Sequence, residues 1–600
     1  MGIVSAKEVA EVLKLEKLGF VGTAIGWLAL KTTRLSVINK EYDKRKDLPA
    51  EEFIASLLER FEIDFEISQE DLKRIPKSGP FITVSNHPLG GIDGMILLQL
   101  LLAQRKDFKI IANFLLQRIA PLHPYILPVN PFESHQETRS SIGGFKAALS
   151  HLKQGYPLGL FPAGEVSTAK DSRRIVDRPW EEPAMKLMKK AQVPVLPIYF
   201  HARNSTFFYR LASISDVLRT AKLPSEMLTQ KRRKIKVRIG NPISVPEQES
   251  IVTLEAYTAF IRRKTYMLGN SFERKKLIER LPRTIKRNRR PKDVVAQEKL
   301  EEMIKEVATC RVMDKRLLES KNYEVFLARK EVIPHILHEI GRLREITFRE
   351  IGEGTNQAID LDKYDDYYYH MFLWDNETNQ IVGAYRMGMG NEIYQTHGIE
   401  GFYLRELFRF EPELHPMMSQ SIEMGRAFIV KEYQQRPMPL FLLWKGIVHC
   451  TLRFPEHQYL IGGVSISNQF TNFSKSLMIE FMKSHYYDPY LAQYVRPKKE
   501  FKVKLSHADK DFVFDATKAD LQKFDRIIDE IEPNNLRLPV LIKKYIKQNA
   551  RVMAFNVDPL FNDAIDGLMY IKIKDLPEST VKPVMEEFQV ELEKKVKNRV

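Results

Sequence analysis

The chain has 600 residues, too many for one hydrophobic core, and its 44% hydrophobic and 28% charged residues are typical of a globular protein rather than a low-complexity one. Its formal net charge of +16 favours anionic partners such as phospholipid headgroups, nucleic acid or an acidic protein. It has two cysteines, Cys310 and Cys450, which argues against a disulfide framework or a cysteine zinc site and suits a reducing cytoplasm.

The first 75 residues favour helices, and one short apolar run among them suggests a membrane surface. LGFVGTAIGWLAL, at 18–30, has 13 residues, whereas a spanning helix needs about 20. Four cations flank this run: Lys14, Lys17, Lys31 and Arg34. With Trp27 inside the run, the pattern favours a helix lying along a bilayer interface, and an ordinary buried helix is an equally good interpretation. We predict 1–75 as a helical, membrane-associating segment without a signal peptide, since Lys and Glu are mixed through its start.

Strand-like runs alternate with helical patterns between 76 and 270. The runs are FITVS at 81–85, FKIIANF at 108–114, GYPLGLF at 155–161, VPVLPIYF at 193–200 and KIKVRIG at 234–240. A helical pattern at 94–105 separates the first two. Apolar runs separated by helices are typical of an α/β layered domain with a mostly parallel sheet.

The composition changes at 272–292, where ten Lys or Arg stand against two Glu. We interpret 271–314 as a basic linker. Its positive charge fits a solvated helix face, a patch that binds a membrane surface, or a patch that binds nucleic acid. Aromatic residues are almost absent from it, which weakens the nucleic-acid alternative.

A second domain is expected over 315–580, followed by a tail at 581–600. Its clearest element is a hairpin, YYYHMFLWDNETNQIVGAYRMGMG, in which two alternating runs flank a polar turn. SIEMGRAFIV, PLFLLWKGIVHCTLRF and QYLIGGVSIS then predict a strand, a helix and a strand in that order.

The first candidate site follows the strand at 81–85, where the sequence continues NHPLGGIDG. In open α/β sheets, ligands bind at the carboxyl ends of the strands, which is where His87 and Asp93 stand. A neutral His accepts a proton near pH 7, and an Asp bonded to its ring fixes the tautomer and stabilises the imidazolium. The three glycines leave N–H groups free for an oxyanion, so the run fits acyl transfer to a hydroxyl. Taken alone, a structural turn explains it better.

Two later motifs in strand regions, FPAGE at 161–165 and VPVLP at 193–197, favour a catalytic site over a structural turn. The series N-H-P-x-x-x-x-D, F-P-x-G-E and V-P-V-x-P resembles the glycerophospholipid (lysophospholipid) acyltransferase family, and its NHPLGG form is similar to the haemolysin-like branch. The resemblance implies an O-acyltransferase with His87 as general base and Asp93 as its partner. It also implies that four residues bind the polar end of the acceptor: Phe161, Pro162, Gly164 and Glu165.

The sequence departs from the common pattern of that family in two places. Five residues separate His87 from Asp93, where the common pattern has four. The basic residue usual after the second motif is replaced by the run Val166-Ser167-Thr168. A glycerol-phosphate acceptor is therefore not implied.

Charged residues recur at informative spacings between 340 and 430. They are Arg344, Asp362, Asp365, Arg386, Glu423 and Arg426, and Phe348 follows one helical turn after the first. Charges on half-buried strands need partners, so we expect the three arginines to pair with the acids. A structural ion-pair network is the plain interpretation, and Glu423 is a candidate for a catalytic base.

The order R-x-x-x-F, D-x-x-D, Y-R and E-x-x-R resembles acyl-homoserine-lactone synthases and, more closely, the ornithine N-acyltransferases of the GNAT superfamily. The run at 537–573 is similar to the end of the latter family. The resemblance spans about 320–575 and implies a GNAT-like α/β domain with a mixed sheet. There an amine attacks the thioester of a fatty acyl-carrier protein, and the seven residues above form the site or a network supporting it.

KEYQQRPMP, at 431–439, stands where many coenzyme-A-dependent GNAT proteins carry a glycine-rich loop for a pyrophosphate. It contains no glycine, so we expect an acyl-carrier protein as donor, with acyl-CoA as the alternative. Such carriers are acidic and would be attracted to a basic chain. No tightly bound cofactor and no metal are expected.

Joined in one chain, the two halves resemble the bifunctional ornithine-lipid (aminolipid) synthases. The resemblance implies that the C-terminal domain N-acylates an amino acid with a 3-hydroxyacyl group and that the N-terminal domain then esterifies the hydroxyl. Ornithine, glycine and lysine all remain open as the amino acid. A 1-acylglycerol-3-phosphate type acyltransferase with a regulatory or inactive second domain is one alternative, and a non-enzymatic membrane-binding protein is another.

The expected partners follow from this hypothesis. They are an acyl-carrier protein, an anionic membrane surface, an amino acid and a lyso-aminolipid, and nucleic acid is not among them. We expect a peripheral protein on the cytoplasmic face of a bacterial inner membrane.

Overall fold

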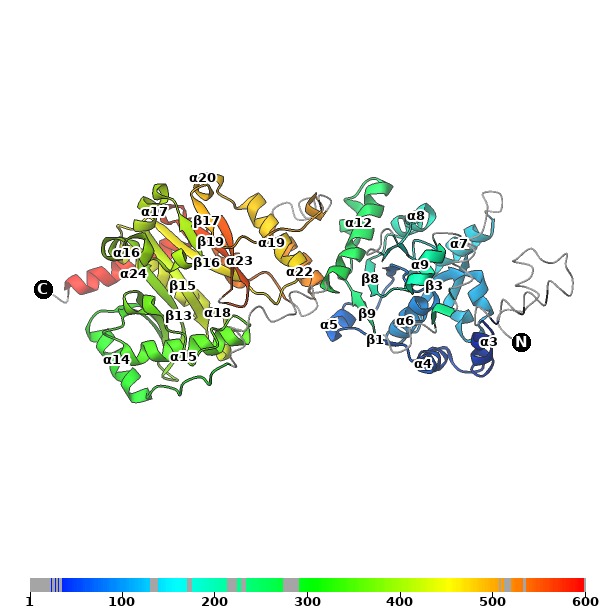
Figure 1. Cartoon of the computed structure of the whole chain (residues 1–600), viewed down its shortest axis with the longest axis horizontal. Helices are drawn as coiled ribbons and strands as arrows, with labels where there is room; N and C mark the ends of the chain where they lie inside the picture. The colour runs from blue at the N-terminus through cyan, green and yellow to red at the C-terminus, as the bar shows by residue number, and fades with distance from the viewer. Residues whose placement is uncertain are drawn as a thin grey trace. The chain divides into compact units, whose positions relative to one another are not determined.

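The computed structural model divides into two compact units (Figure 1). Unit 1 comprises Met1–Glu273 and the short segment Asp529–Asn535, and unit 2 comprises Arg274–Ile528 and Leu536–Val600. The structure describes residues 23, 27, 31, 35–129, 139–169, 175–212, 223, 225–227, 234–272, 291–506, 509–511, 520–532, 536–559 and 561–597.

Unit 1 is built on a seven-stranded sheet with the order β1-β9-β8-β2-β5-β3-β4. The strands are β1 (Asp64–Glu66), β2 (Ile82–Ser85), β3 (Lys109–Asn113), β4 (Ile126–Val129), β5 (Leu158–Leu160), β8 (Val195–His201) and β9 (Lys234–Ile239). Neighbouring strands pair in parallel, except that β8 and β9 are antiparallel. The predicted, mostly parallel α/β sheet is confirmed.

Helices cover both faces of this sheet because successive side chains of a strand point to opposite sides. One face carries α4 (Ala50–Arg60) and α6 (Gly91–Leu102), and the other carries α7 (Arg139–Lys153), α8 (Glu182–Ala191) and α12 (Leu254–Met267). On β8, Leu196 packs into the first of these cores and Val195 into the second. α6 is buried on nearly every side, and its sequence is accordingly apolar apart from Asp93 and Gln99.

The predicted helical segment 1–75 is only partly helical. Its described part forms α3 (Leu35–Asp43), α4 and α5 (Gln69–Lys73), but β1 joins the sheet, with Phe65 opposite Ile235 of β9. The segment therefore belongs to the core of unit 1. The apolar run 18–30 lies outside the described residues except for Thr23 and Trp27. Within the described ranges, no helix is long and apolar enough to cross a membrane.

Unit 2 contains an eight-stranded mixed sheet with the order β10-β11-β12-β13-β15-β16-β19-β18. The strands are β10 (Arg316–Ser320), β11 (Tyr323–Arg329), β12 (Tyr369–Asp375), β13 (Gln380–Met389), β15 (Ser421–Ile429), β16 (Tyr459–Ile466), β18 (Arg551–Asp558) and β19 (Ala564–Lys572). β12 and β13 are the predicted hairpin. The parallel pairing of β15 and β16 covers only four residues of each strand and ends at Met424 opposite Gly462.

Two long helices lie on opposite faces of this sheet, α15 (Pro334–Glu350) and α18 (Pro437–Arg453). Met371 of β12 packs against Gly446 of α18 on one face of the sheet. The preceding residue, His370, faces the charged residues around α15 on the other face. The charged side chains of α15 and of β13 therefore share one face of the sheet.

The remaining elements complete unit 2. They include α14 (Leu300–Val312), α16 (Gly390–His397), α17 (His415–Ser419), α19 (Asn472–His485), α20 (Pro489–Ala492), α22 (Leu521–Ile531), α23 (Val540–Ile546), α24 (Glu578–Lys597) and the small pair β14 (Phe408–Phe410) and β17 (Val495–Pro497). Two predicted boundaries fall inside structured elements. The end of the 271–314 linker is α14, whose buried face includes Val307, and the 580/581 boundary cuts α24. Of the basic stretch, 273–290 lie outside the described residues.

Candidate functional sites

The NHPLGGIDG turn leaves the centre of the unit 1 sheet. β2 pairs on both sides, with Val84 opposite Leu160 of β5 and Pro197 of β8. The chain then turns at Gly90, whose φ is +75°, and enters α6. His87 therefore stands at the carboxyl edge of parallel strands, where ligands bind in such sheets.

Asp93 is fully buried and holds this turn together. Its Oδ2 accepts hydrogen bonds from the N–H groups of Leu89 at 2.7 Å and Gly90 at 3.1 Å. Nδ1 of His87 lies 3.2 Å from the same oxygen, as a close contact rather than a well-aligned hydrogen bond. Burial raises the pKa of Asp93, and the contact with His87 opposes that rise.

Gly90 explains how five intervening residues still bring His87 and Asp93 together. It is the N-cap of α6 and adopts a left-handed φ, which favours glycine. Asp93 is the third residue of the helix, so its carboxylate reaches back to the cap. With this cap, five intervening residues bring the carboxylate of Asp93 back to the ring of His87.

β5 delivers the second motif to the same edge. The ring of Phe161 lies against the ring of His87, with centroids 4.2 Å apart. Gly164 turns the loop with a φ of +64°, and its N–H donates to the Phe161 carbonyl at 3.0 Å. Phe161 is thus the residue of this motif that contacts His87.

The other two residues of the FPAGE prediction occupy different surroundings. Pro162 is buried, and its carbonyl accepts the N–H of Glu181 at 2.8 Å. Glu165 is exposed and pairs with Arg178 at 3.2 Å. Pro162 therefore shapes the loop, whereas Glu165 lies at the surface.

A buried carboxylate that the sequence analysis missed, Asp177, ties the first two motifs together. Its Oδ1 accepts the N–H of His87 at 3.1 Å and the hydroxyl of Ser167 at 2.5 Å. The N–H of Ser167 donates to the His87 carbonyl at 2.9 Å. Asp177 lies in a stretch without hydrophobic periodicity, so no sequence signal distinguishes it.

The third motif fixes the turn from the opposite side. Asn86 donates from Nδ2 to the Phe200 carbonyl at 3.0 Å and accepts the Phe200 N–H at 2.7 Å. Asn204 donates to the Pro88 carbonyl at 2.9 Å. The backbone around His87 is therefore held from β8 as well as from the β5 loop, and its side chain remains 17% exposed. An imidazole held in this way can accept a proton from a bound hydroxyl.

In unit 2, six of the seven predicted residues come together on one face of the sheet. Arg344 on α15 makes a bidentate pair with Asp365, both contacts being 3.0 Å. Arg386 on β13 contacts Asp362 at 2.6 Å and Asp365 at 3.3 Å. Arg426 on β15 contacts Asp362 at 3.3 Å. The predicted pairing of arginines with acids is present.

The network also contains residues that the sequence analysis missed. Asp360 contacts both Arg344 at 3.4 Å and Arg426 at 3.6 Å. The guanidinium of Arg386 lies over the rings of Tyr364, Tyr368 and Tyr403, at 5.5, 5.3 and 5.0 Å from their centroids. The tyrosine-rich run at 364–369 is the sequence signal for two of these rings, and Tyr403 has none.

Burial and charge oppose each other in this network. Burial alone would raise the pKa of Asp365, but the Arg344 and Arg386 guanidinium groups hold it well below its usual range. Both arginine side chains are 1% exposed. A buried ion pair of this kind mainly supports the structure, because losing one partner leaves an uncompensated charge.

Glu423 differs from the aspartates of the network because, among the described interactions, it accepts hydrogen bonds from neutral groups and forms no ion pair. Tyr368 donates its hydroxyl to Oε2 at 2.7 Å, and the Leu404 N–H donates to Oε1 at 3.0 Å. Burial raises the pKa of Glu423 to about 7. A carboxyl group that titrates near neutral pH suits proton transfer.

Phe348 is the one predicted residue of the second site that has no contact with the charged groups among the described interactions. It lies one turn after Arg344 on α15 and is half-buried, and its carbonyl accepts the N–H of Glu353. It therefore packs beside the network.

The start of α18 is poor in backbone donors. The helix begins at Pro437, and Pro439 also lies in its first turn. Proline has no N–H, so two of the amides that would meet an anion at a helix N-terminus are missing.

Comparisons with known proteins agree with the two-unit architecture. Residues 9–275 match the family model described as Acyltransferase, and residues 343–444 match the one described as Acetyltransferase (GNAT) domain. A glycine N(alpha)-acyltransferase of Phocaeicola vulgatus is 26% identical over 282 residues, which are 44% of this chain and 85% of that protein. A lyso-glycine lipid O-acyltransferase of Bacteroides thetaiotaomicron is 27% identical over 240 residues, which are 38% of this chain and 85% of that protein.

Among solved structures, the 1-acyl-sn-glycerophosphate acyltransferase of Thermotoga maritima is 16% identical and covers 45% of this chain and 97% of its own. Its TM-score is 0.24, too low to support a structural argument.

Proposed function

We propose that this chain, an acyltransferase with an N-terminal acyltransferase domain and a C-terminal GNAT domain, makes an acyloxyacyl aminolipid in two steps. Unit 2 transfers a 3-hydroxyacyl group from a thioester to the amine of an amino acid. Unit 1 then transfers a second acyl group to the 3-hydroxyl. The observation that carries the proposal is the presence, in one chain, of the His87–Asp93 pair and the charged network around Glu423.

In the second step, Nε2 of His87 accepts the proton of the substrate hydroxyl as its oxygen attacks the thioester carbonyl. The contact of Nδ1 with Asp93 supports this role because it favours the imidazolium that forms. The carbon–sulfur bond breaks, and the thiol leaves with the proton. The absence of a basic residue at 166–168 favours an acceptor without a glycerol phosphate.

Glycine is the amino acid that we favour, and ornithine is the alternative. Two relatives, a glycine N(alpha)-acyltransferase and a lyso-glycine lipid O-acyltransferase, are named for the two steps of such a synthesis. Each relative matches less than half of this chain, which supports a fusion of the two activities.

Acyl-carrier protein is the donor that we favour over acyl-CoA. The run 431–439 has no glycine, and Pro437 and Pro439 remove N–H groups where a pyrophosphate would bind. A carrier protein presents only a phosphopantetheine arm, and its acidic surface would be attracted by a net charge of +16.

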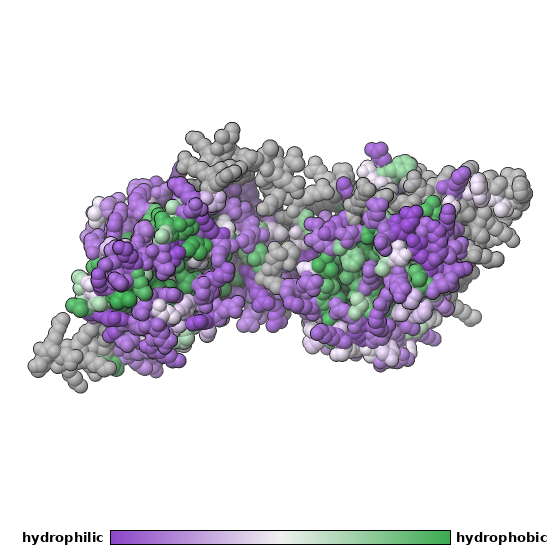
Figure 2. All heavy atoms as spheres, turned by 90° about the horizontal axis from the view of Figure 1, so that it is seen from below, coloured by the Kyte–Doolittle hydropathy of each residue, from purple (hydrophilic) through white to green (hydrophobic). Residues whose placement is uncertain are grey.

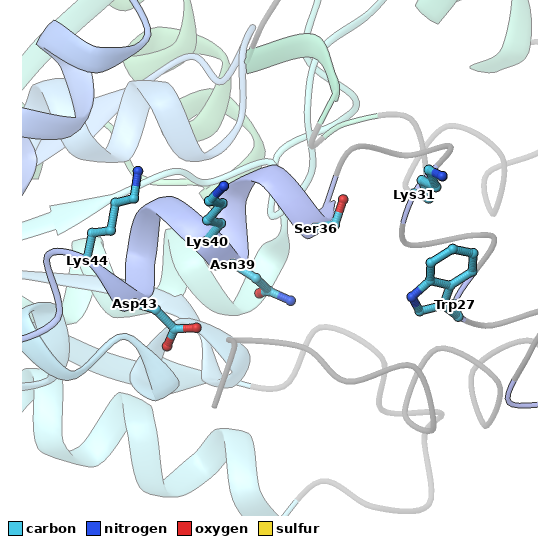
Figure 3. Close-up of a pocket in the computed structure, with 7 residues that line it drawn as sticks. All are labelled: Trp27, Lys31, Ser36, Asn39, Lys40, Asp43 and Lys44. Carbon is cyan, nitrogen blue, oxygen red and sulfur yellow. The ribbon is translucent and has the colours of Figure 1, made fainter.

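An anionic membrane surface is the partner that we propose for unit 1. A hollow of about 640 Å³ beside α3 is lined by Trp27, Lys31, Ser36, Asn39, Lys40, Asp43 and Lys44 (Figure 3). Trp27 is 59% exposed, and the ammonium of Lys31 lies 5.2 Å from its ring centroid. An exposed Trp among lysines is typical of residues at the headgroup level.

The exposed surface of unit 1 agrees with this partner. Figure 2 shows apolar residues gathered between hydrophilic ones on one face of this unit. Phe207 is 58% exposed. We therefore propose a peripheral protein that meets its lipid substrate at the bilayer surface.

A product assay tests the proposal. The purified protein is incubated with 3-hydroxyacyl-carrier protein, acyl-carrier protein and either glycine or ornithine, and the lipids are identified by mass spectrometry. We expect an amide-linked 3-hydroxyacyl glycine and then its O-acylated product. An enzyme that acylates lysophosphatidic acid and forms no amide with either amino acid would contradict the proposal.

A further inference from the structure

Arg426 lies at a distorted point of β15. Its φ of +53° is left-handed, which is unfavourable for a non-glycine residue. The pairing of β13 with β15 shifts register close to it. Its guanidinium stacks on Phe561, 4.6 Å from the ring centroid, and on Tyr403 at 5.1 Å. Phe561 lies in the loop between β18 and β19, so this side chain reaches the hairpin that those strands form.

One donor of this guanidinium is unused. Nη2 contacts Asp362 and Asp360, whereas Nε is buried and has no hydrogen-bond partner among the described residues. The side chain is only 10% exposed. A buried N–H without an acceptor is unfavourable, so this position is suited to an anionic group that arrives with a ligand.

Three further carboxyl groups act on one another, those of Glu353, Asp558 and Asp566, and the charge of Arg426 reaches Asp566. Asp566 on β19 lies opposite Ser465 of β16, and the Ser465 hydroxyl donates to Oε2 of Glu353 at 2.8 Å. Asp558 ends β18, the other strand of the hairpin. Burial, and then the charges of Asp558 and Glu353, raise the pKa of Asp566 well above its usual value, while Arg426 opposes this effect.

The charge balance singles out these carboxyls. The three arginines of the network face the three aspartates Asp360, Asp362 and Asp365, so Glu353, Asp558 and Asp566 are additional acids. Among the described groups, Arg426 is the only cation that acts on Asp566, and none acts on Glu353. A ligand ammonium would stabilise the charged form of these carboxyls, and a ligand carboxylate would pair with the unused donor of Arg426, so the position matches a small molecule that carries both charges.

We propose that Arg426 and the carboxyls of Glu353 and Asp566 bind the amino-acid acceptor by its two charged ends, with the substrate carboxylate on Nε of Arg426 and the ammonium on the carboxyls. This inference rests on the proposed N-acyl transfer and adds that the acceptor must be an amino acid with a free carboxylate. The site adjoins the point where β15 and β16 stop pairing, two residues before Arg426. β15, β16 and β19 can be followed side by side in Figure 1.

The chemistry balances with these groups. The bound ammonium loses one proton to a carboxylate and becomes an amine. Its nitrogen forms the new carbon–nitrogen bond while the thioester carbon–sulfur bond breaks. The second proton leaves with the thiol.

The wild-type protein provides the first test, because it needs no variant. The rate of N-acyl transfer is measured against the concentration of glycine and of glycinamide, which lacks the carboxylate. We expect the KM for glycinamide to be about ten- to a hundredfold higher, as for loss of a charged hydrogen bond. Equal KM values would overturn the inference.

Two variants identify the residues. Arg426→Gln should raise the KM for glycine and remove its advantage over glycinamide. Asp566→Asn should raise the KM for both amines and leave the KM for the acyl donor unchanged. Asp563→Asn is the matched control, because it lies in the same hairpin and pairs with Lys499 at 2.8 Å. An Arg426→Gln protein that still prefers glycine would overturn the assignment.

The outcomes separate this inference from the proposed function. A wild-type protein that acylates no amino acid refutes the N-acyl step itself. A wild-type protein that acylates glycine and glycinamide equally keeps that step and refutes the binding site. O-acylation of a synthetic lyso-lipid by each variant, together with its circular dichroism spectrum, shows that the protein is folded.

Discussion

Oδ2 of Asp93 lies 3.2 Å from Nδ1 of His87 and also accepts the two N–H groups at the start of α6. One buried oxygen therefore orients the imidazole and caps the helix. Substitutions at the two residues should consequently have different effects on activity and on stability.

His87→Ala should abolish O-acyl transfer and preserve N-acyl transfer. Loss of a general base typically lowers a rate by about 10²–10⁴-fold. Mass spectrometry should show the mono-acylated lipid accumulating without the diacylated product. Exchanging the half-buried His338 for Ala in unit 2 is the control and should leave both products, because His338 pairs with Glu298 outside both candidate sites. If the His87 variant still forms the diacylated lipid, another group is the base.

Asp93→Asn and Asp93→Ala separate the two roles of this carboxyl. The amide oxygen of Asn can still accept an N–H at the helix start, so we expect little loss of stability but a large loss of O-acyl transfer. Ala removes the cap as well and should destabilise the protein by about 1–2 kcal/mol. Thermal unfolding and the O-acylation rate measure the two effects. Equal stability of the two variants would contradict the capping role.

Glu423 should give the N-acyl step a pH dependence. Its pKa of about 7 lies above the ordinary value of 4.5, and the ionised form is the one that accepts a proton. kcat/KM should therefore rise as the pH increases through about 7, and Glu423→Gln should lose this limb together with most of the activity. If kcat/KM of the variant still rises through about pH 7, a group other than Glu423 causes the pH dependence.

The same shift has a consequence for stability. The raised pKa favours the protonated carboxyl in the folded protein. Its contribution to stability is fully present below about pH 4.5 and is lost as the pH rises through about 7. The melting temperature of the wild-type protein should therefore fall more steeply over this range than that of Glu423→Gln.

Arg344→Ala should be strongly destabilising. It leaves the buried Asp365 with one cation fewer, and breaking such a pair typically costs about 3–5 kcal/mol. Lys330→Ala, which breaks an exposed pair with Asp366, is the control and should cost far less, because solvent screens that pair. Chemical denaturation followed by fluorescence compares them. Similar losses would show that the network is not a buried support.

Lysines around the α3 hollow should control binding to anionic vesicles. A lysine near such a surface contributes about 1 kcal/mol, so exchanging Lys31, Lys40 and Lys44 for Gln should weaken binding about a hundredfold. The control exchanges three lysines that pair with surface acids, Lys73, Lys106 and Lys186. Sedimentation with phosphatidylglycerol vesicles measures both. Equal weakening would mean that net charge alone attracts the protein.

Local sequence patterns predicted the parts of the fold that depend on periodicity. The run at 193–200 became β8, which begins two residues later and ends one residue later, and the hairpin around DNETNQ became β12 and β13. β1 was missed because a strand of three residues has too little alternation to stand out among helices. α14 was missed because it lies in the stretch 271–314, which we interpreted as a basic linker. Its buried face includes Met303 and Cys310.

The residues of the candidate sites also divide into those that a local sequence pattern marks and those that have no such pattern. Residues within motifs, such as His87 and Arg386, were identified because their spacing is informative. Asp177 and Asp566 were missed because each acts through partners distant in the chain. A carboxylate on an ordinary strand has no local pattern, and only the pairing of β19 with β16 places Asp566 beside Glu353.

Gly90 has a consequence for recognising relatives of this chain. The distance between the ring of His87 and the carboxylate of Asp93 depends on where Asp93 stands in the first turn of α6, because the cap ahead of it can take up an added residue. A search that counts a fixed number of positions between the two would overlook chains of this kind. A search anchored on the helix start, with a glycine at the cap and an acid three residues later, would find them.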